Sequence, residues 1–295
     1  MKMKSTIILK AGRGLCLISA LNPAVFLMSA GSATAVERAQ NSALQPSRLS
    51  YADIVDLADT APLVLQARVL NMIALPPAPA TNVVPGTRRY YIEAQVTGLI
   101  RGDGGISPTV SYLYDVPLDA RGKPPKLKKT TVILFARAGA RPGEIQLTAR
   151  DAQLAATPAE ISRVKAILSD LVAPGAPPRI LGLGDAFHVA GTVAGEGETQ
   201  IFLRTENGEP VSLSIIRRPG LEPRWALALG EIVDEAARPP ERGSLLWYRL
   251  ACGLPPSLPP RSVRTLAAPD AEAARADYEL VIAALGRCDR TRPAS

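Results

Sequence analysis

The sequence predicts a mainly β protein with helices, of the α+β class, in which an OB-like antiparallel barrel precedes a smaller β-meander and C-terminal helices. Three observations lead to this prediction. Proline and glycine account for 27 and 23 of the 295 residues, which favours short strands and many turns. Apolar and polar residues alternate with a period of two in most of the segments before residue 150. Helical periodicity then replaces this alternation, once mid-chain and again near the C-terminal end.

The first 35 residues have the three parts of a secretory signal peptide. Residues 1–35 contain four basic side chains and no acid, followed by an apolar stretch over 15–30 and an Ala-Thr-Ala sequence that ends at Ala35. Asn22-Pro23 interrupts the apolar stretch, which falls short of the ~20 residues that cross a bilayer, so a retained anchor is only the alternative. We expect cleavage after Ala35, a periplasmic or secreted location, and no transmembrane segment in the mature chain.

The rest of the chain divides into three predicted parts. Residues 36–49 are polar and without pattern, and we interpret them as a flexible leader. Residues 50–172 form the OB-like barrel with flanking helices, and residues 179–295 form the β-meander with its C-terminal helices. The boundary between these two regions is the proline-rich stretch Ala173–Pro178.

The barrel region begins and ends with a predicted helix. Ser50 with Asp53 three residues later predicts a capping box, and Thr157 with Pro158 and Glu160 predicts a second helix start. Between them, alternating or continuous apolar runs predict strands over 63–71, 89–97, 110–114, 131–136 and 145–149. Five strands in about ninety residues suit a small closed or nearly closed antiparallel barrel.

The second region predicts a β-meander and a helical end. A strand over 187–193 is followed by Asn207-Gly208 between two apolar-rich runs, which predicts a hairpin with a type I′ turn. A further strand is predicted over 224–229. Helices are predicted over 244–252 and 270–285 because glycine follows each apolar stripe.

Two cysteines remain after the leader is removed. Cys16 lies inside the predicted signal peptide, so the mature chain keeps Cys252 and Cys288. Both lie at the ends of predicted helices, and an oxidising compartment allows them one intramolecular pairing. We predict a Cys252–Cys288 disulfide; two separately buried thiols are the alternative.

Composition excludes several kinds of chemistry. With His188 as the single histidine and both mature cysteines oxidised, the chain lacks the ligands of a typical zinc site, and we expect no metal. It contains no Walker loop, Rossmann fingerprint, C-x-x-C or Gly-x-Ser-x-Gly sequence, so we expect no cofactor. The mature chain has a net charge near +3, which does not favour nucleic-acid binding. His188 is interpreted as an ordinary strand residue, with a functional base as the alternative.

One segment carries a concentrated positive charge and is the candidate binding site. Its cations are Arg121, Lys123, Lys126, Lys128 and Lys129. They lie between two predicted strands, in a loop stiffened by Pro124-Pro125, and long-range attraction would bring an anionic envelope component or an acidic protein to them. A solvated loop without a partner is the alternative.

Two stretches resemble known groups of proteins. "VLQARVLNM", "YYIEAQVTGLIRG" and "KKTTVILFARAG" resemble the OB-type barrels of netrin-like and metalloproteinase-inhibitor-like modules, although the cysteines of those families are absent. Residues 200–255, beginning "QIFLRTENGEPVSLSII", resemble a family of exported alphaproteobacterial proteins. The second resemblance implies a bacterial envelope location and implies neither an activity nor a functional residue.

These observations favour a non-catalytic role. The leading hypothesis is an exported binding or assembly module of the bacterial cell envelope, with a barrel face or the basic loop as its contact surface. The alternative is a hydrolase of an envelope polymer that uses a carboxylate pair, which would place two carboxylates roughly 5–10 Å apart in a cleft.

Overall fold

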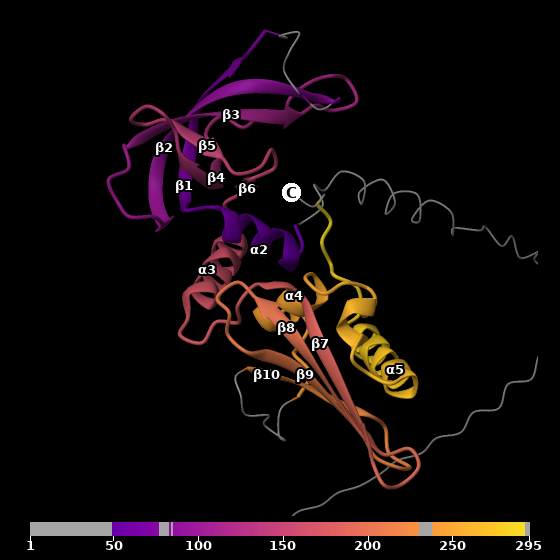
Figure 1. Ribbon diagram of the computed structural model, residues 1–295. Coiled ribbons are helices and arrows are strands. Elements are labelled where there is room, and N and C mark those ends of the chain that lie inside the picture. Colours follow the sequence, from indigo (N-terminus) through magenta and orange to yellow (C-terminus); the bar gives the residue numbers. More distant parts are fainter. Residues whose placement is uncertain (1–48, 77–82, 84, 230–237, 293–295) are drawn as a thin grey trace, which may run out of the picture. The chain divides into compact units, whose positions relative to one another are not determined.

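The described part of the chain forms two antiparallel sheets and four α-helices, which places it in the α+β class (Figure 1). The computed structural model describes residues 49–76, 83, 85–229 and 238–292. The predicted signal peptide and nearly all of the predicted leader lie outside these residues. The boundary predicted at Ala173–Pro178 stays a prediction. In the described part of the chain, no helix is long and apolar enough to span a bilayer.

The first sheet is built around its first strand. Its members are β1 (Leu63–Ala74), β2 (Thr87–Arg101), β3 (Thr109–Pro117), β4 (Thr131–Ala138), β5 (Ile145–Leu147) and β6 (Gln153–Ala155). The order is β3-β2-β1-β4-β5, with β6 paired to β4, and the ladders are antiparallel. The sequence predicted five of these strands and missed β6.

The strands of this sheet do not close into a barrel, so the predicted closure is not confirmed. Between β3 and β5 the described residues form one isolated parallel bridge, Ser111 with Glu144. The physical reason is length: β5 has three residues, and these already pair with β4 from Ala136 to Ala138. A strand this short cannot extend a second ladder along β3.

The inner face of the first sheet has its own apolar core. Leu65, Ile92, Tyr112, Leu134 and Ile145 come from five different strands and are almost completely buried. On β2 the predicted alternation is confirmed, since Tyr90, Ile92 and Ala94 are buried while their neighbours are more exposed. The side chains on the outer face of β2 do not take part in this core and remain more exposed.

Helices α2 (Tyr51–Thr60) and α3 (Pro158–Val172) flank the first sheet in the sequence. The Ser50 side chain accepts a hydrogen bond from the Asp53 N–H, and the Asp53 carboxylate accepts one from the Ser50 N–H, so the predicted capping box is confirmed. The Thr157 side chain accepts from the Glu160 N–H and caps α3 as predicted. Both helices begin where the sequence places them because their caps are local.

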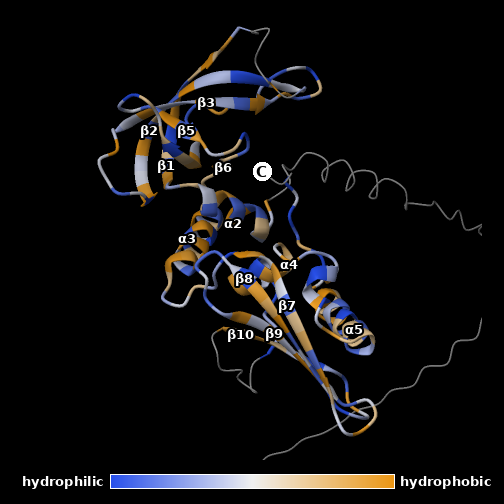
Figure 2. Ribbon diagram, in the orientation of Figure 1, coloured by the Kyte–Doolittle hydropathy of each residue, from blue (hydrophilic) through white to orange (hydrophobic). Residues whose placement is uncertain are grey.

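The second sheet is a meander in the order β10-β9-β8-β7. Its strands are β7 (Ile180–Ala190), β8 (Gly197–Thr205), β9 (Val211–Arg217) and β10 (Arg224–Leu229). The strand predicted over 187–193 was misplaced: β7 begins at Ile180, directly after the proline-rich stretch. Figure 2 shows hydrophobic stretches among more polar ones on β7 and β8, and on their exposed side Phe187 and Phe202 pack edge to face with ring centroids 5.8 Å apart.

The hairpin between β8 and β9 forms where predicted, but its predicted turn type is wrong. Gly208 has a φ of 73°, whereas Asn207 is not among the residues with positive φ, so the turn is not type I′. Instead the Thr205 hydroxyl donates to the Glu209 carbonyl at 2.8 Å, and the Asn207 side chain accepts from the Glu209 N–H. Pro210 follows and has no N–H to continue a tight ladder.

The C-terminal part is helical and packs on the second sheet. It comprises α4 (Leu245–Ala251), the 3-10 turn Pro260–Val263 and α5 (Ala268–Leu285). A single core cluster contains Leu57 of α2, Ile167 of α3, Ile201 of β8, Trp247 of α4 and Tyr278 of α5. Burial on this scale, at about 25 cal/mol per Å² of apolar surface, makes packing the main source of stability here.

Candidate functional site

The predicted basic loop connects β3 to β4 and is fixed by hydrogen bonds at both ends. At its start, the Asp119 carboxylate accepts from the N–H groups of Arg121 and Lys123, each at 2.8 Å. At its end, the Lys129 N–H donates to the Val69 carbonyl at 2.8 Å, with a φ of 68° at Lys129. The Leu127 side chain packs against the core of the first sheet. The loop therefore has a defined conformation.

The five cations of this loop are exposed and unpaired. Arg121, Lys123, Lys126, Lys128 and Lys129 are all exposed. Among the residues that the structure describes, their charged groups form no ion pair with any carboxylate. The structure thus holds five cationic side chains on one ordered loop.

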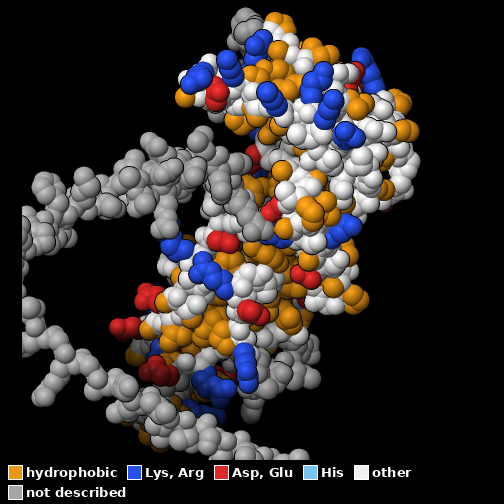
Figure 3. Space-filling view, turned by 180° about the vertical axis from the view of Figure 1, so that it is seen from behind, with side chains coloured by type: hydrophobic (Ala, Val, Ile, Leu, Met, Phe, Trp, Pro, Cys, Tyr) orange, Lys and Arg blue, Asp and Glu red, His pale blue; other side chains and the backbone are white. Residues whose placement is uncertain are grey.

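The rest of the first sheet adds to this positive charge. Residues 61–156 contain twelve Lys and Arg against six Asp and Glu, a formal net charge of +6. Figure 3 shows Lys and Arg side chains spread over this part of the surface, with few acids among them. An anionic ligand would be attracted to this surface as a whole, most strongly at low salt.

A groove of about 670 Å³ lies on the outer face of β2 and β3, next to β5 and the turn before it. Arg89, Tyr91, Leu113 and Asp115 from β2 and β3 line one side, and Arg150 lies among the residues of the other side. Arg89 binds Asp115 in a bidentate pair, with Nε to Oδ1 at 2.6 Å and Nη2 to Oδ2 at 2.8 Å. The volume falls within the usual range for a ligand site.

One of the two carboxylates in this groove is already engaged by an arginine. Its acids are Asp115 and Glu144. Both oxygens of Asp115 bind the Arg89 guanidinium, which opposes a role in proton transfer. In the described part of the chain, no group of three or more His, Cys, Asp or Glu side chains lies close enough to hold a metal ion.

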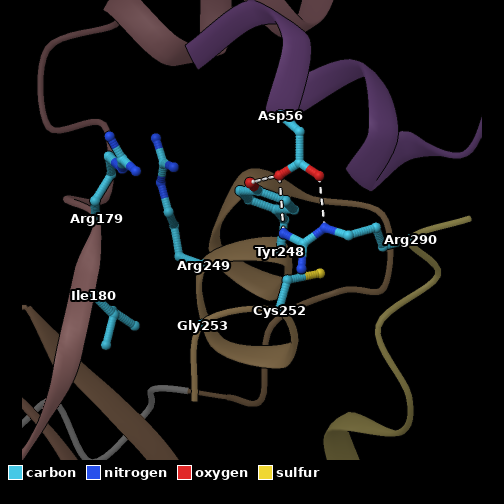
Figure 4. Close-up of a pocket in the computed structure, with 8 residues that line it drawn as sticks. All are labelled: Asp56, Arg179, Ile180, Tyr248, Arg249, Cys252, Gly253 and Arg290. Atoms are coloured by element: carbon cyan, nitrogen blue, oxygen red, sulfur yellow. Dashed lines mark hydrogen bonds and ion pairs between the residues drawn. The ribbon is translucent and has the colours of Figure 1, made fainter. Parts of the chain in front are cut away.

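A second, smaller cavity of about 240 Å³ lies among α2, the start of β7, α4 and the C-terminal residues (Figure 4). Asp56 reaches into it from α2. The Tyr248 hydroxyl donates to Asp56 Oδ1 at 2.5 Å, and Arg290 Nε donates to Oδ2 at 2.6 Å. The hydrogen bond to Asp56 raises the pKa of Arg290, so this guanidinium stays charged.

The other two arginines of this cavity lie beside each other in Figure 4 and share one acid. Arg249 Nη1 binds Asp59 Oδ2 at 2.5 Å, and Arg179 Nε lies 4.0 Å from the same oxygen. Arg249 is 8% exposed and Asp59 is 12% exposed. Arg249 and Arg290 are each bound to an aspartate of α2, so these two side chains join α4 and the C-terminal segment to that helix.

Asp53, one turn before Asp56, anchors the C-terminal segment to α2. Burial alone would raise the pKa of the Asp53 carboxyl, but hydrogen bonds from the Thr291 hydroxyl and from the N–H groups of Arg292, Ser50 and Thr291 outweigh burial and lower it to about 2. The carboxylate is therefore charged at neutral pH. It stabilises the helix start and the chain end together.

The two cysteines among the described residues lie at disulfide distance. Cys252 is the C-cap of α4 and Cys288 follows α5, and their sulfur atoms are 2.09 Å apart with Cα atoms 5.0 Å apart. This is the pairing that the sequence predicts. It holds the segment that ends at Arg292 close to α2.

His188 belongs to a chain of hydrogen bonds that sequence reasoning missed. The Thr199 hydroxyl donates to the Asp277 carboxylate, so its oxygen accepts from His188 Nδ1 at 2.8 Å. Arg217 Nε binds the same carboxylate. Thr199 and Asp277 are completely buried. These hydrogen bonds join α5 to three strands of the second sheet, so their role is to hold the helix on the sheet. The sequence does not reveal Asp277 as a member, because an acid on a helix is common and usually exposed.

Comparisons with known proteins add no functional residue. The chain matches no protein-family model and no curated protein significantly. The site must therefore be argued from its own residues. Sequence reasoning identified the basic loop and the cysteine pair; it missed the groove, the α2 network and the His188 chain, whose members lie far apart in the sequence.

Proposed function

We propose that this chain is an exported, non-catalytic binding or assembly module of the bacterial cell envelope, and that the basic loop is its contact surface for an anionic partner. The observation that carries the proposal is the set of five exposed cations on a hydrogen-bonded loop without an acid partner among the described residues. Unpaired like charges repel one another and contribute little to stability, so a partner that supplies negative charge is the simplest use for them.

We infer in addition that the first sheet is an opened OB-like barrel. The strand order β3-β2-β1-β4-β5 and the single parallel bridge from Ser111 to Glu144 support this inference. OB-folds bind extended ligands on the face of their second and third strands. The groove beside Tyr91 and Leu113 lies on that face. A binding module of this kind needs no catalytic residue.

A binding experiment with a matched control tests the loop. The loop variant replaces Arg121, Lys123, Lys126, Lys128 and Lys129 with Gln. The control variant removes the same charge at five exposed arginines outside the first sheet, namely Arg218, Arg224, Arg264, Arg275 and Arg287. Polyglutamate and polygalacturonate serve as a polypeptide and a polysaccharide anion.

We expect both polyanions to bind the mature protein and to dissociate as salt shortens the Debye length below about 10 Å. The loop variant should lose most of this affinity and the control variant little. If both variants lose the same affinity, binding depends on net charge alone, and the loop is not the contact surface.

Export is tested separately. Cell fractionation followed by N-terminal sequencing should give periplasmic or secreted protein that starts at Val36. Cytoplasmic protein with an intact Met1 would contradict the envelope location and leave the loop experiment unaffected.

A further inference from the structure

One edge of β3 is open along most of its length. The Ser111 N–H donates to the Gly143 carbonyl at 2.8 Å, on the side of β3 that faces β5. Main-chain groups of a strand alternate in direction, so the N–H and C=O groups of Leu113 and Asp115 point to the same side as those of Ser111. Beyond the Ser111–Glu144 bridge, the described residues show no further pairing between β3 and β5, and β2 occupies the other edge of β3.

Among the described residues, β3 forms a ladder with β2 alone, and its pairing on the other side is limited to the bridge from Ser111 to Glu144. Leu113 and Asp115 lie beyond this bridge, so no ladder engages their outward N–H groups in the described part of the chain. The groove lies directly against them, since both residues line it. Their spacing is two residues, roughly 6.6–7 Å, which is the repeat of an extended polypeptide.

The side chains around this edge suit an alternating peptide with acidic residues. Leu113 is 50% exposed and pairs in register with Tyr91, which gives an apolar floor for every second side chain. Arg150, at the groove, is exposed and forms no ion pair among the described residues. The basic loop begins a few residues beyond Asp115, so further cations follow the end of the strand.

We propose that the groove binds an extended acidic peptide segment of a partner protein, which adds to the free edge of β3 as a strand. This inference rests on the proposed function and names its partner class. Strand addition gives affinity through main-chain hydrogen bonds, and side-chain contacts give specificity. A polysaccharide could meet the same charges, but its repeat does not match donors and acceptors spaced as in a β-strand.

The test uses an acetylated, amidated nonapeptide of alternating Val and Glu, and a second peptide with N-methyl groups on every other residue. The protein variants are Leu113→Pro, which removes the N–H that faces the groove, and Leu113→Ala, which keeps it. Proline is tolerated on an edge strand whose N–H faces outward, and a melting curve shows whether this variant folds. The readouts are calorimetric affinity and amide hydrogen exchange at Leu113 and Asp115.

We expect the peptide to slow exchange at both amides, and we expect N-methylation or Leu113→Pro to weaken binding about tenfold or more through lost hydrogen bonds. Leu113→Ala should weaken it less. The N-methyl arm uses the unchanged protein and is independent of how any variant folds. Absence of saturable binding at millimolar peptide, or binding without slowed exchange, overturns strand addition.

The remaining outcomes separate this inference from the proposed function. If polygalacturonate slows exchange at Leu113 and Asp115 and the peptide does not, the groove is a glycan site and strand addition is wrong. If these amides become protected without peptide as the protein concentration rises, a second copy occupies the edge, which also overturns it. If the loop variant keeps its affinity for polyanions while the peptide still protects β3, the loop proposal alone fails.

Discussion

The aspartates of α2 and the cations of the basic loop are both runs of like charge, and the structure places them in opposite surroundings. Asp53, Asp56 and Asp59 follow one another at every third residue, and each accepts hydrogen bonds from the C-terminal part of the chain. The five cations of the loop find no such partner among the described residues. Paired charges with little exposure hold elements together, whereas exposed unpaired charges leave stability almost unchanged and remain open to a ligand.

Arg249→Ala should give the largest loss of stability. It tests directly whether the ion pairs of the α2 aspartates stabilise the fold. It leaves Asp59, which is 12% exposed, without its closest cation. Breaking such a pair costs about 3–5 kcal/mol of unfolding free energy, measurable by urea denaturation. Arg218→Ala, at an exposed arginine, is the control and should change stability by less than about 0.5 kcal/mol.

A loss below about 1 kcal/mol in Arg249→Ala would contradict this expectation and indicate that Arg179 takes over Asp59. The double variant Arg179→Ala/Arg249→Ala distinguishes the two cases. It should add a further loss only if Arg179 has moved from its 4.0 Å separation into direct contact.

Removal of the disulfide should lower the unfolding free energy nearly as much as Arg249→Ala. The pair closes a sequence separation of 36 residues, for which the chain-entropy model gives roughly 3–4 kcal/mol. The variant Cys252→Ser/Cys288→Ser should therefore melt at a lower temperature than the mature protein. Reductant should lower the melting temperature of the unchanged protein and leave the variant unaffected; an unchanged protein that is insensitive to reductant would argue against the bond.

Asp53→Asn should reduce stability by about 2 kcal/mol at pH 7, from the lowering of its pKa to about 2. A lowered folded-state pKa stabilises the protein above the unfolded pKa near 4, and this contribution disappears as pH falls toward 2. The difference in unfolding free energy between the two proteins should therefore shrink between pH 4 and pH 2. Asp103→Asn, at an exposed acid, should show no such difference. A constant difference across this range would assign the effect to packing.

The loop variant described above should show the smallest stability change, within about 0.5 kcal/mol, because its five side chains are exposed and unpaired. Thermal melts at low and high salt measure this. If neutralising the loop destabilises the fold by more than about 2 kcal/mol, the cations have partners within the protein, and the contrast with α2 fails.

Local sequence patterns predicted most helices and strands correctly, but they did not predict whether the first sheet closes into a barrel. The capping boxes at Ser50 and the N-cap at Thr157 depend on contacts within four residues, so the sequence sets where α2 and α3 begin. The barrel depends on how far β5 extends along β3, which no local pattern records: the alternation predicts a strand over 145–149, and β5 ends at Leu147. The Asn207-Gly208 turn shows the same limit, because Pro210 and the Thr205 side chain override the local preference for a type I′ turn.

The run of cations, the pairing of Cys252 with Cys288, and most of the strands and helices follow from the sequence, since each depends on residue identity or on a short-range pattern. Three features come from tertiary contacts instead: α2 pairs with residues about 190–240 positions away, Asp277 reaches Thr199, and β3 forms a ladder on one side alone among the described residues. These contacts join residues that are distant in the chain. Packing brings them together, and they leave no local pattern in the sequence.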